Sequence, residues 1–440
     1  MKKFLLIIVS LIFSTEISFS QEHKLSIEQS IVIALENSKD LKISDSKVRS
    51  NEAKIKEVTS QFLPQFKLNA GYTRLSNVDP FLVIIPFSPM PVQISEVLLN
   101  NYNLRLSLQQ QLFTGYKLSS LRNSATLNMQ SSKVEFDNER NNVAYNVQIS
   151  YWNYYKSIQI KTIADENVVQ SELHVVDTKN FLTNGLATNS DLLKLEVLNS
   201  NAKLQQLEAY NNIDLARISF NKILGLPLES NTEPGQESIY SEIKEFNLAS
   251  LINEAKDNRY ELKALDYKIK SANENINAAR SSYYPSVFIF GNAYYSNPNL
   301  RIQPPRNTFD ATWDLGVQLS WDVWNWGNTS SQVTQAEQIL LQNKLNYEQL
   351  KESIELEVNQ NYLNVNYLKE RIEVIKKTIE QSSENYRVTK EIYNVQLATS
   401  TDLADAETSL FQSQINYTNA LIDYKIALLK LYKAVGRKLY

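Results

Sequence analysis

The chain has 440 residues, with 45 Lys and Arg against 48 Asp and Glu, and it contains no Cys. The lack of Cys excludes disulfides, zinc–thiolate sites, thiol nucleophiles and a lipidated N-terminal Cys. The formal charge of −3 indicates no broad basic face for nucleic acid. Only 9 Gly and 11 Pro are present, so the sequence permits very long helices.

Residues 1–20 have the composition of a secretory signal peptide. Lys2 and Lys3 precede a short apolar stretch, and Ser18 and Ser20 place small residues at −3 and −1 of a cut before residue 21. An uncleaved N-terminal anchor is the alternative. No run of about 18 apolar residues follows, so no membrane-spanning helix is expected in the mature protein. The protein is therefore predicted to leave the cytoplasm.

Two copies of one pattern organise the mature chain. Leu186-Ala187-Thr188 recurs as Leu397-Ala398-Thr399, at an offset of 211, and Phe62-Leu63-Pro64 recurs as Tyr283-Tyr284-Pro285, at an offset of 221. A longer segment in the first copy, about 77–103, accounts for the change of offset. The predicted organisation is a signal peptide, a first repeat, a linker that contains Pro and Gly, and a second repeat, over residues 1–20, 21–225, 226–247 and 248–440.

Each copy contains two runs of alternating apolar and polar residues, which indicate strands with one apolar face. Pro64 and Pro285 precede the strand pairs and favour extended backbone before them. The alternation is clear in Trp313–Trp321. The four predicted strands cover about 65–76, 103–113, 286–296 and 312–322.

A long helix is expected after each strand pair. Residues 116–182 and 328–395 contain neither Pro nor Gly, and each would be roughly 100 Å long. Returning helices over about 191–224 and 402–435 would complete two antiparallel coiled-coil hairpins. The expected N-caps of the returning helices are Asn189 or Ser190 and Ser400 or Thr401.

Four strands cannot close a barrel, and open edges are not tolerated in lipid. Bacterial outer-membrane barrels have at least eight strands, so several chains must contribute, and three chains would give twelve strands. Trp residues lie at the two ends of the fourth predicted strand and just beyond it, where a membrane-interface belt is expected. Packing between strand and helix is the alternative for the last two of Trp313, Trp321, Trp324 and Trp326.

Between strands and long helices lie Phe113-Thr114-Gly115 and Trp324-Asn325-Trp326-Gly327. These two motifs and the two hairpin turns follow one another in the same order in both repeats. With this order of motifs, essentially all of residues 24–440 resembles the TolC-like outer-membrane efflux family. The resemblance implies a mainly α chain with a β-barrel part: long coiled-coil hairpins in two repeats and a 12-stranded trimeric barrel. It implies an exit duct in the cell outer membrane that extends into the periplasm and serves a tripartite efflux pump or a type I secretion system. A periplasmic adaptor protein and an inner-membrane transporter would be its partners.

The resemblance also implies a gate at the periplasmic end. Asp402 and Asp405 match the aspartates that line the family's constriction, although helix capping is the alternative role. Tyr393 and Asp191 match a tyrosine and an aspartate that hold the entrance shut, and for Asp191 capping is again an alternative. Ala398 stands where the family's lock has an arginine. What replaces that arginine is open.

No catalytic or metal-binding motif is present, so the chain is predicted not to be an enzyme and to carry no cofactor or metal. His174, in the first long helix, is interpreted as a solvated or packed side chain. A soluble periplasmic coiled-coil tether or adaptor is the competing function, but it leaves the strands unexplained. The sequence does not choose among drugs, metal ions and proteins as the transported substrate. It also leaves open the role of the apolar loop at residues 81–87.

Overall fold

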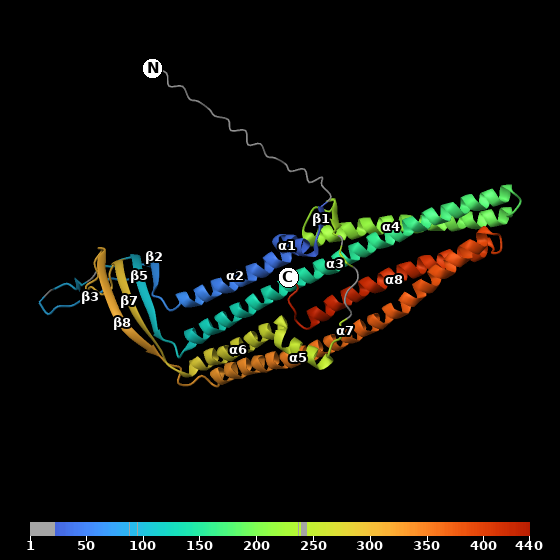
Figure 1. Cartoon of the computed structure of the whole chain (residues 1–440). Coiled ribbons are helices and arrows are strands. Elements are labelled where there is room, and N and C mark those ends of the chain that lie inside the picture. Colours follow the sequence, from blue (N-terminus) through green and yellow to red (C-terminus); the bar gives the residue numbers. More distant parts are fainter. Residues whose placement is uncertain (1–22, 88, 95, 236, 239–243) are drawn as a thin grey trace, which may run out of the picture. The chain divides into compact units, whose positions relative to one another are not determined.

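The computed structural model describes residues 23–87, 89–94, 96–235, 237–238 and 244–440, and the predicted signal peptide lies outside these residues. The chain is mainly helical and contains one four-stranded sheet (Figure 1), which confirms the predicted fold class. Within the described residues no helix is long and apolar enough to cross a membrane. The elements in chain order are β1 His23–Leu25, α1 Ile27–Asn37, α2 Lys39–Ser60, β2 Gln65–Arg74, β3 Leu82–Val83, β4 Val92–Gln93, β5 Asn100–Phe113, α3 Lys117–Thr183, α4 Asn189–Leu224, β6 Thr232–Pro234, α5 Leu248–Asn258, α6 Tyr260–Arg280, the 3-10 turn Ser281–Tyr283, β7 Ser286–Asn297, β8 Asp310–Ser320, α7 Asn328–Asn394 and α8 Ser400–Ala434.

The chain folds into two compact units, and each unit combines elements of both sequence repeats. Unit 1 consists of the described residues up to Lys39 together with those of Arg140–Ser250 and Val358–Tyr440. Unit 2 consists of Asp40–Glu139 and Leu251–Glu357. The two 67-residue helices, α3 and α7, each contribute to both units.

Unit 2 contains the four-stranded sheet. Its strand order is β2-β5-β7-β8, and every neighbouring pair is antiparallel. The loop that joins β2 to β5 carries the two-residue strands β3 and β4, which pair with each other. β2 follows α2, and β7 follows the 3-10 turn. The helical backbone ends at both places because Pro64 and Pro285 disfavour it in the residue that precedes them. The sheet therefore continues directly from the helices of its own unit.

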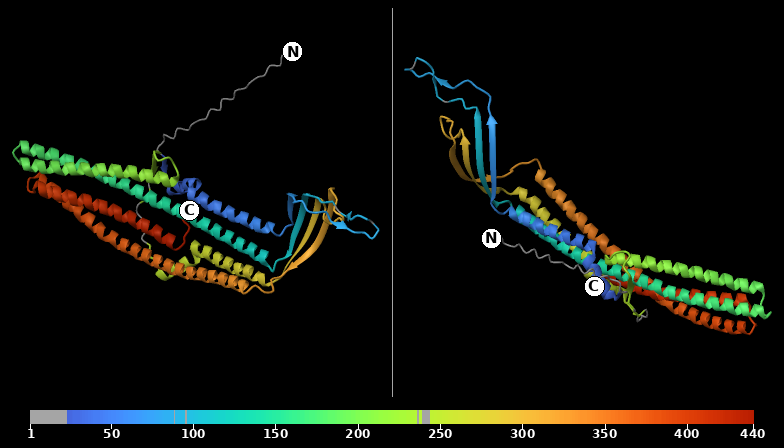
Figure 2. Two further views of the ribbon diagram at one scale, coloured as in Figure 1. Left: turned by 180° about the vertical axis from the view of Figure 1, so that it is seen from behind. Right: turned by 90° about the horizontal axis from the view of Figure 1, so that it is seen from above.

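Unit 1 contains two helical hairpins. The C-terminal half of α3 lies beside α4, and that of α7 beside α8 (Figure 2). One apolar core is built around Tyr151, Tyr154 and Phe220, which are almost fully buried and pack ring against ring. The hydroxyls of the two tyrosines donate to the carbonyls of Gly235 and Thr232 at 3.1 and 2.9 Å. Residues 232–235 of the inter-repeat segment are thereby fixed to α3, since buried polar groups must find partners.

The end of α4 packs closely against α1. Gly225 follows α4 in the left-handed conformation, with φ +71°. The Asn37 side chain donates to the Leu224 carbonyl at 3.1 Å. A Cβ on Gly225 would lie 2.6 Å from the Asn37 Cβ. Gly225 is therefore required both for its backbone conformation and for the close approach of α1.

This close approach predicts a difference between two glycine substitutions. Gly185 also has a left-handed backbone, φ +74°, but a Cβ there meets no atom within 4 Å. Gly185→Ala is expected to cost only the left-handed conformation, about 1–2 kcal/mol. Gly225→Ala is expected to cost at least about 1 kcal/mol more, because α1 must move. Unfolding midpoints of the two variants in denaturant test this, and equal losses would contradict it.

Candidate functional site: the hairpin ends of unit 1

The two hairpins of unit 1 end in the same backbone turn. In the first, α3 ends at Thr183 and Gly185 takes the left-handed conformation. In the second, α7 ends at Asn394 and Gln396 does so, with φ +64°. In each turn an amide bonds back five residues, Leu186 to Phe181 at 2.8 Å and Leu397 to Ile392 at 2.9 Å. The 211-residue repeat is therefore preserved in the geometry of both turns.

A reciprocal capping box begins each returning helix. Thr188 accepts from the Asp191 amide at 3.2 Å, while the Asp191 carboxylate accepts from the Thr188 amide at 3.0 Å. Thr399 and Asp402 repeat the arrangement at 3.2 and 2.9 Å. The predicted N-caps Asn189 or Ser190 and Ser400 or Thr401 are therefore wrong by one or two residues. The cap is the Thr three residues before the Asp, because this spacing satisfies two helix-end amides at once.

Asp191 also joins the two hairpins. Its second carboxylate oxygen accepts from the Ser400 hydroxyl at 2.7 Å, and Ser400 is only 2% exposed. Hydrogen bonds from the Thr188 side chain, and then from Ser400, lower the pKa of Asp191 to about 2. Lys194 of α4 makes a second link to the Thr401 hydroxyl at 3.0 Å. Asp191 thus caps its own helix and bonds to the start of α8.

Asp402 and Asp405 lie three residues apart on the first turns of α8, and both are exposed. The Asp402 carboxylate accepts from the Thr399 side chain at 2.6 Å. Hydrogen bonding to Thr399 lowers the pKa of Asp402, so this residue is a carboxylate in its capping role. Asp405 lies on the same face, since residues three apart on a helix are neighbours. The structure therefore brings the two carboxylates together at the start of the helix.

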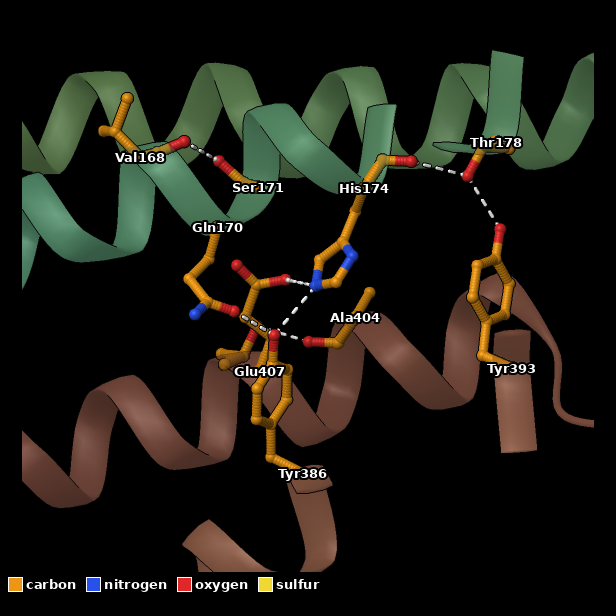
Figure 3. A network of polar contacts seen from close by, with 10 residues as sticks. Val168, Gln170, Ser171, His174, Thr178, Tyr386, Tyr393, Ala404 and Glu407 are labelled. Carbon is orange, nitrogen blue, oxygen red and sulfur yellow. Dashed lines mark hydrogen bonds and ion pairs between the residues drawn. The ribbon is translucent and has the colours of Figure 1, made fainter. Parts of the chain in front are cut away.

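Tyr393 lies in an apolar cluster beneath the second turn and is only 4% exposed. Its hydroxyl donates to the Thr178 hydroxyl of α3 at 2.7 Å, and Thr178 donates to the His174 carbonyl (Figure 3). Tyr393 and Asp191 therefore bond to different partners in this structure. Ala398, at the position where the family's lock has an arginine, packs against the same apolar cluster.

Sequence reasoning missed a buried polar cluster at this end of the hairpins. His174 and Glu407 are 2% and 3% exposed, and their side chains approach to 3.6 Å. His174 also bonds to the Tyr386 hydroxyl at 2.9 Å (Figure 3). His174 is thus packed rather than solvated. The spacing Leu403, Glu407, Phe411 was the available signal, because it places a carboxylate within an apolar stripe of α8.

The four candidate interface tryptophans belong to unit 2. Trp313 lies within β8 and is 72% exposed, whereas Trp321 follows the strand and donates to the Tyr283 carbonyl at 3.2 Å. Trp324 and Trp326 are exposed and pack edge to face with centroids 5.8 Å apart. The last two tryptophans contact each other, and both keep most of their ring surface accessible.

Comparisons with known proteins show the family and the fold of this chain. The family model described as "Outer membrane efflux protein" matches residues 31–226 and 251–437. The chain is 21% identical to the outer membrane protein TolC of Escherichia coli (strain K12) over 456 aligned residues, which cover 99% of this chain and 87% of TolC. Two solved structures share the fold. A structure of CusC covers 96% of each chain, with a TM-score of 0.79 at 16% identity. The outer membrane protein VceC of Vibrio cholerae covers 94% of this chain and 97% of its own, with a TM-score of 0.77 at 16% identity.

The bond between Asp191 and Ser400 predicts a measurable coupling between the hairpins. Ser400→Ala is expected to lower the free energy of unfolding by about 1–2 kcal/mol, because a buried donor to a carboxylate is lost. In an Asp191→Ala background the same change is expected to have almost no effect. Thr401→Ala removes only the exposed link to Lys194 and serves as the comparison, with an expected loss below about 0.5 kcal/mol. Additive losses in the double variant would contradict the assignment.

Proposed function

Because this chain belongs to the outer membrane efflux protein family, we propose that three copies assemble into one channel of the cell outer membrane. The channel extends into the periplasm and is the exit duct for efflux. In this proposal the periplasmic end is gated, and a periplasmic adaptor protein and an inner-membrane transporter deliver the substrate to it. The same duct suits a tripartite efflux pump or a type I secretion system. The observation that carries the proposal is the incomplete sheet of unit 2.

The sheet has two free edges. Among the described residues of one chain, β2 and β8 each pair with a single neighbour. Unpaired backbone N–H and C=O groups are very costly in hydrocarbon, so a sheet in the membrane must close on itself. Pairing β8 of one copy with β2 of the next satisfies both edges. Three copies then supply twelve strands, an even number within the range of outer-membrane barrels.

The two faces of the sheet differ in chemistry, as a barrel wall requires. One face carries a chain of hydrogen bonds, in which Arg105 donates to Asn292 at 2.8 Å and Asn292 donates to Asp314 at 2.6 Å. The other face carries exposed apolar side chains, each between 63% and 72% accessible: Phe66, Leu68, Trp313, Leu315, Val317 and Leu319. The polar face would line the lumen, and the apolar face would contact lipid.

Aromatic residues mark both ends of the apolar face. One end has a contacting cluster of rings, Tyr72, Tyr102, Tyr295 and Phe309. The other end has Trp321, followed by Trp324 and Trp326. Ala311 pairs with Tyr295 in the sheet, so the distance from the ring cluster to Trp321 is ten residues along β8. At about 3.3 Å per residue and a tilt of about 45°, this spans roughly 23 Å, close to the apolar band of about 25 Å in such barrels.

In this frame Trp321, Trp324 and Trp326 would form the interface belt on the helix side. Trp313 lies two residues from Ala311, so it would lie just inside the opposite belt. Tryptophan and tyrosine favour these positions because one part of the ring system is apolar and the other reaches water.

The hairpins of unit 1 also leave apolar seams uncovered by their own chain. On α7, Leu363, Tyr367 and Val374 follow heptad steps of 4 and 7 and are 60–65% exposed. On α4, a similar seam is 40–66% exposed and comprises Leu193, Val197, Leu204, Leu207, Leu215 and Ile218. Seams of this spacing pack against other helices in coiled coils. A ring of three copies would bury each seam against a neighbouring copy.

The competing function, a soluble coiled-coil tether or adaptor, accounts for the hairpins alone. It gives no role to a sheet whose apolar face is exposed over four strands. A tether would be extracted from cells without detergent, whereas a channel would need detergent. The apolar sheet face therefore favours the channel.

For the gate, we propose that Asp402 and Asp405 line the periplasmic constriction as two rings of three carboxylates. Asp191 and Tyr393 would hold the hairpins in the closed state through Ser400 and Thr178, with 2.7 Å bonds at both places. These two bonds would replace the contact that an arginine at position 398 would make. Rings of carboxylates favour cations in a narrow passage.

The free edges predict a trimer in mild detergent. The purified protein is expected to have the mass of three chains, because a single chain leaves both β2 and β8 unpaired. Light scattering or native mass spectrometry measures this. A stable monomer in detergent would contradict the channel.

The carboxylate rings predict a change in ion selectivity. The single variant Asp405→Asn and the double variant with Asp402→Asn are both expected to reduce cation selectivity in planar-bilayer recordings. The double variant removes up to six negative charges from one short stretch of the pore. Only Asp402→Asn is expected to lower stability, by about 0.5–1 kcal/mol, since Asp402 alone belongs to the capping box. Unchanged selectivity in both variants would show that the carboxylates do not line the lumen.

A further inference from the structure

A titratable pair is buried where the two hairpins of unit 1 meet. His174 comes from α3 and Glu407 from α8, and both are almost inaccessible to solvent. Tyr386 of α7 and Gln170 of α3 complete the cluster (Figure 3). Three helices from both repeats therefore contribute to one polar site inside an otherwise apolar contact.

The hydrogen bonds fix which nitrogen of His174 carries a proton. The Tyr386 hydroxyl donates to the Gln170 side-chain oxygen. Its oxygen then accepts, so the Nε2 of His174, 2.9 Å away, is the donor. The nearest Glu407 oxygen lies 3.6 Å from the same nitrogen. Both Glu407 oxygens are buried without a hydrogen bond.

An ionised carboxylate without hydrogen bonds is costly in such a place. Burial raises the pKa of Glu407 to about 7, although Lys390 of α7 opposes this. Burial lowers the pKa of His174 to about 4, with Lys390 acting in the same direction and Asp177 of α3 opposing. Burial, and then Glu407, also raise the pKa of Tyr386, which stays neutral. Neutral His174 beside protonated Glu407 is therefore the favoured state, and the pair then carries one titratable proton and no net charge.

We propose that His174 and Glu407 hold one proton between them, and that this single-proton pair keeps the contact between the hairpins insensitive to pH in the mildly acidic range. The two groups act as a unit, since either one alone would make the contact strongly pH-dependent. The proposal concerns the packing of the hairpins and stands apart from the channel function.

The two groups contribute to stability with opposite dependences on pH. Glu407, with a raised pKa, contributes stability that is complete below its ordinary pKa of 4.5 and is lost as the pH rises through about 7. His174, with a lowered pKa, contributes stability that is complete above 6.5 and is lost as the pH falls through about 4. Between 4.5 and 6.5 the packed and separated hairpins both bind one proton. The two dependences therefore cancel in this range.

The sequence repeat supplies a matched control. The offset of 211 places Glu196 at the position that corresponds to Glu407 and Asn385 at the position that corresponds to His174. Glu196 is exposed on α4. The single-proton pair therefore exists on one side of the repeat only, and its counterpart is a surface carboxylate on the same kind of helix.

Local hydrogen exchange of the full-length protein in detergent tests the proposal. Protection factors, corrected for intrinsic exchange, are measured between pH 4 and 7.5 in the peptides that contain residues 170–178 and 403–411. Wild type is expected to be level from pH 4.5 to 6.5. His174→Gln is expected to lose protection as the pH rises, and Glu407→Gln as it falls, each by a factor on the order of 10². The double variant and Glu196→Gln are expected to be as level as wild type.

Two results would overturn the proposal. One is a level profile in both single variants, and the other is a slope that persists in the double variant, which would assign the titration to other groups. If His174→Gln does not fold, His174→Asn takes its place, because Asn occupies the corresponding position 385. Planar-bilayer recordings of the same preparations separate the two proposals. If no channels form but the two single variants show the expected opposite pH slopes of protection, only the channel is refuted. If channels are normal but both single variants have level profiles, only the single-proton pair is refuted.

Discussion

The free edges of the four-stranded sheet constrain the rest of the molecule. A strand edge in hydrocarbon leaves backbone groups without partners, at several kcal/mol for each group. One chain provides β2 and β8 as edges and has no further long strand among its described residues to cover them. In a closed sheet, the apolar face would contact lipid and its aromatic ends would lie at the two membrane interfaces. The uncovered seams of α4 and α7 also need neighbouring helices, and in the proposed assembly other copies of the chain supply them.

The two hairpin ends have the same backbone geometry but different side-chain environments. Turn geometry and capping boxes are the same in both repeats, down to the Thr and Asp that form them. Some of the side chains beneath differ. Tyr386 and Tyr393 of the second repeat correspond to Val175 and Leu182 of the first, whereas the buried Glu407 corresponds to an exposed glutamate, Glu196. Each described polar contact between the hairpins therefore joins one residue of the first repeat to one of the second, and none of these contacts is repeated symmetrically.

Local features were readable from the sequence. The absence of Pro and Gly predicted the first long helix to within one residue of Lys117–Thr183, and period-two alternation predicted the strands. The N-caps were misplaced because a capping preference was weighed without its partner three residues later. At the hairpin ends, Asp191 and Asp402 both belong to capping boxes, which was the alternative role that the sequence indicated for them. The bond from Asp191 to Ser400 joins residues 209 apart, and the His174–Glu407 contact spans a comparable separation. Such contacts depend on how hairpins pack, which one sequence does not specify.

Pairing of β8 of one copy with β2 of the next can be tested with engineered cysteine pairs, because the chain has no native Cys. Asn69→Cys on β2 would be combined in turn with a single Cys at each position from 311 to 319 on β8, and oxidation followed on a denaturing gel. Asn69→Cys with Arg105→Cys, which are paired within one sheet, would serve as the intrachain control. Covalent dimers and trimers are expected when the second Cys is at the β8 position opposite Asn69, with weaker bonding two residues to either side on the same face. A working control without any bond between copies at any position would contradict this pairing.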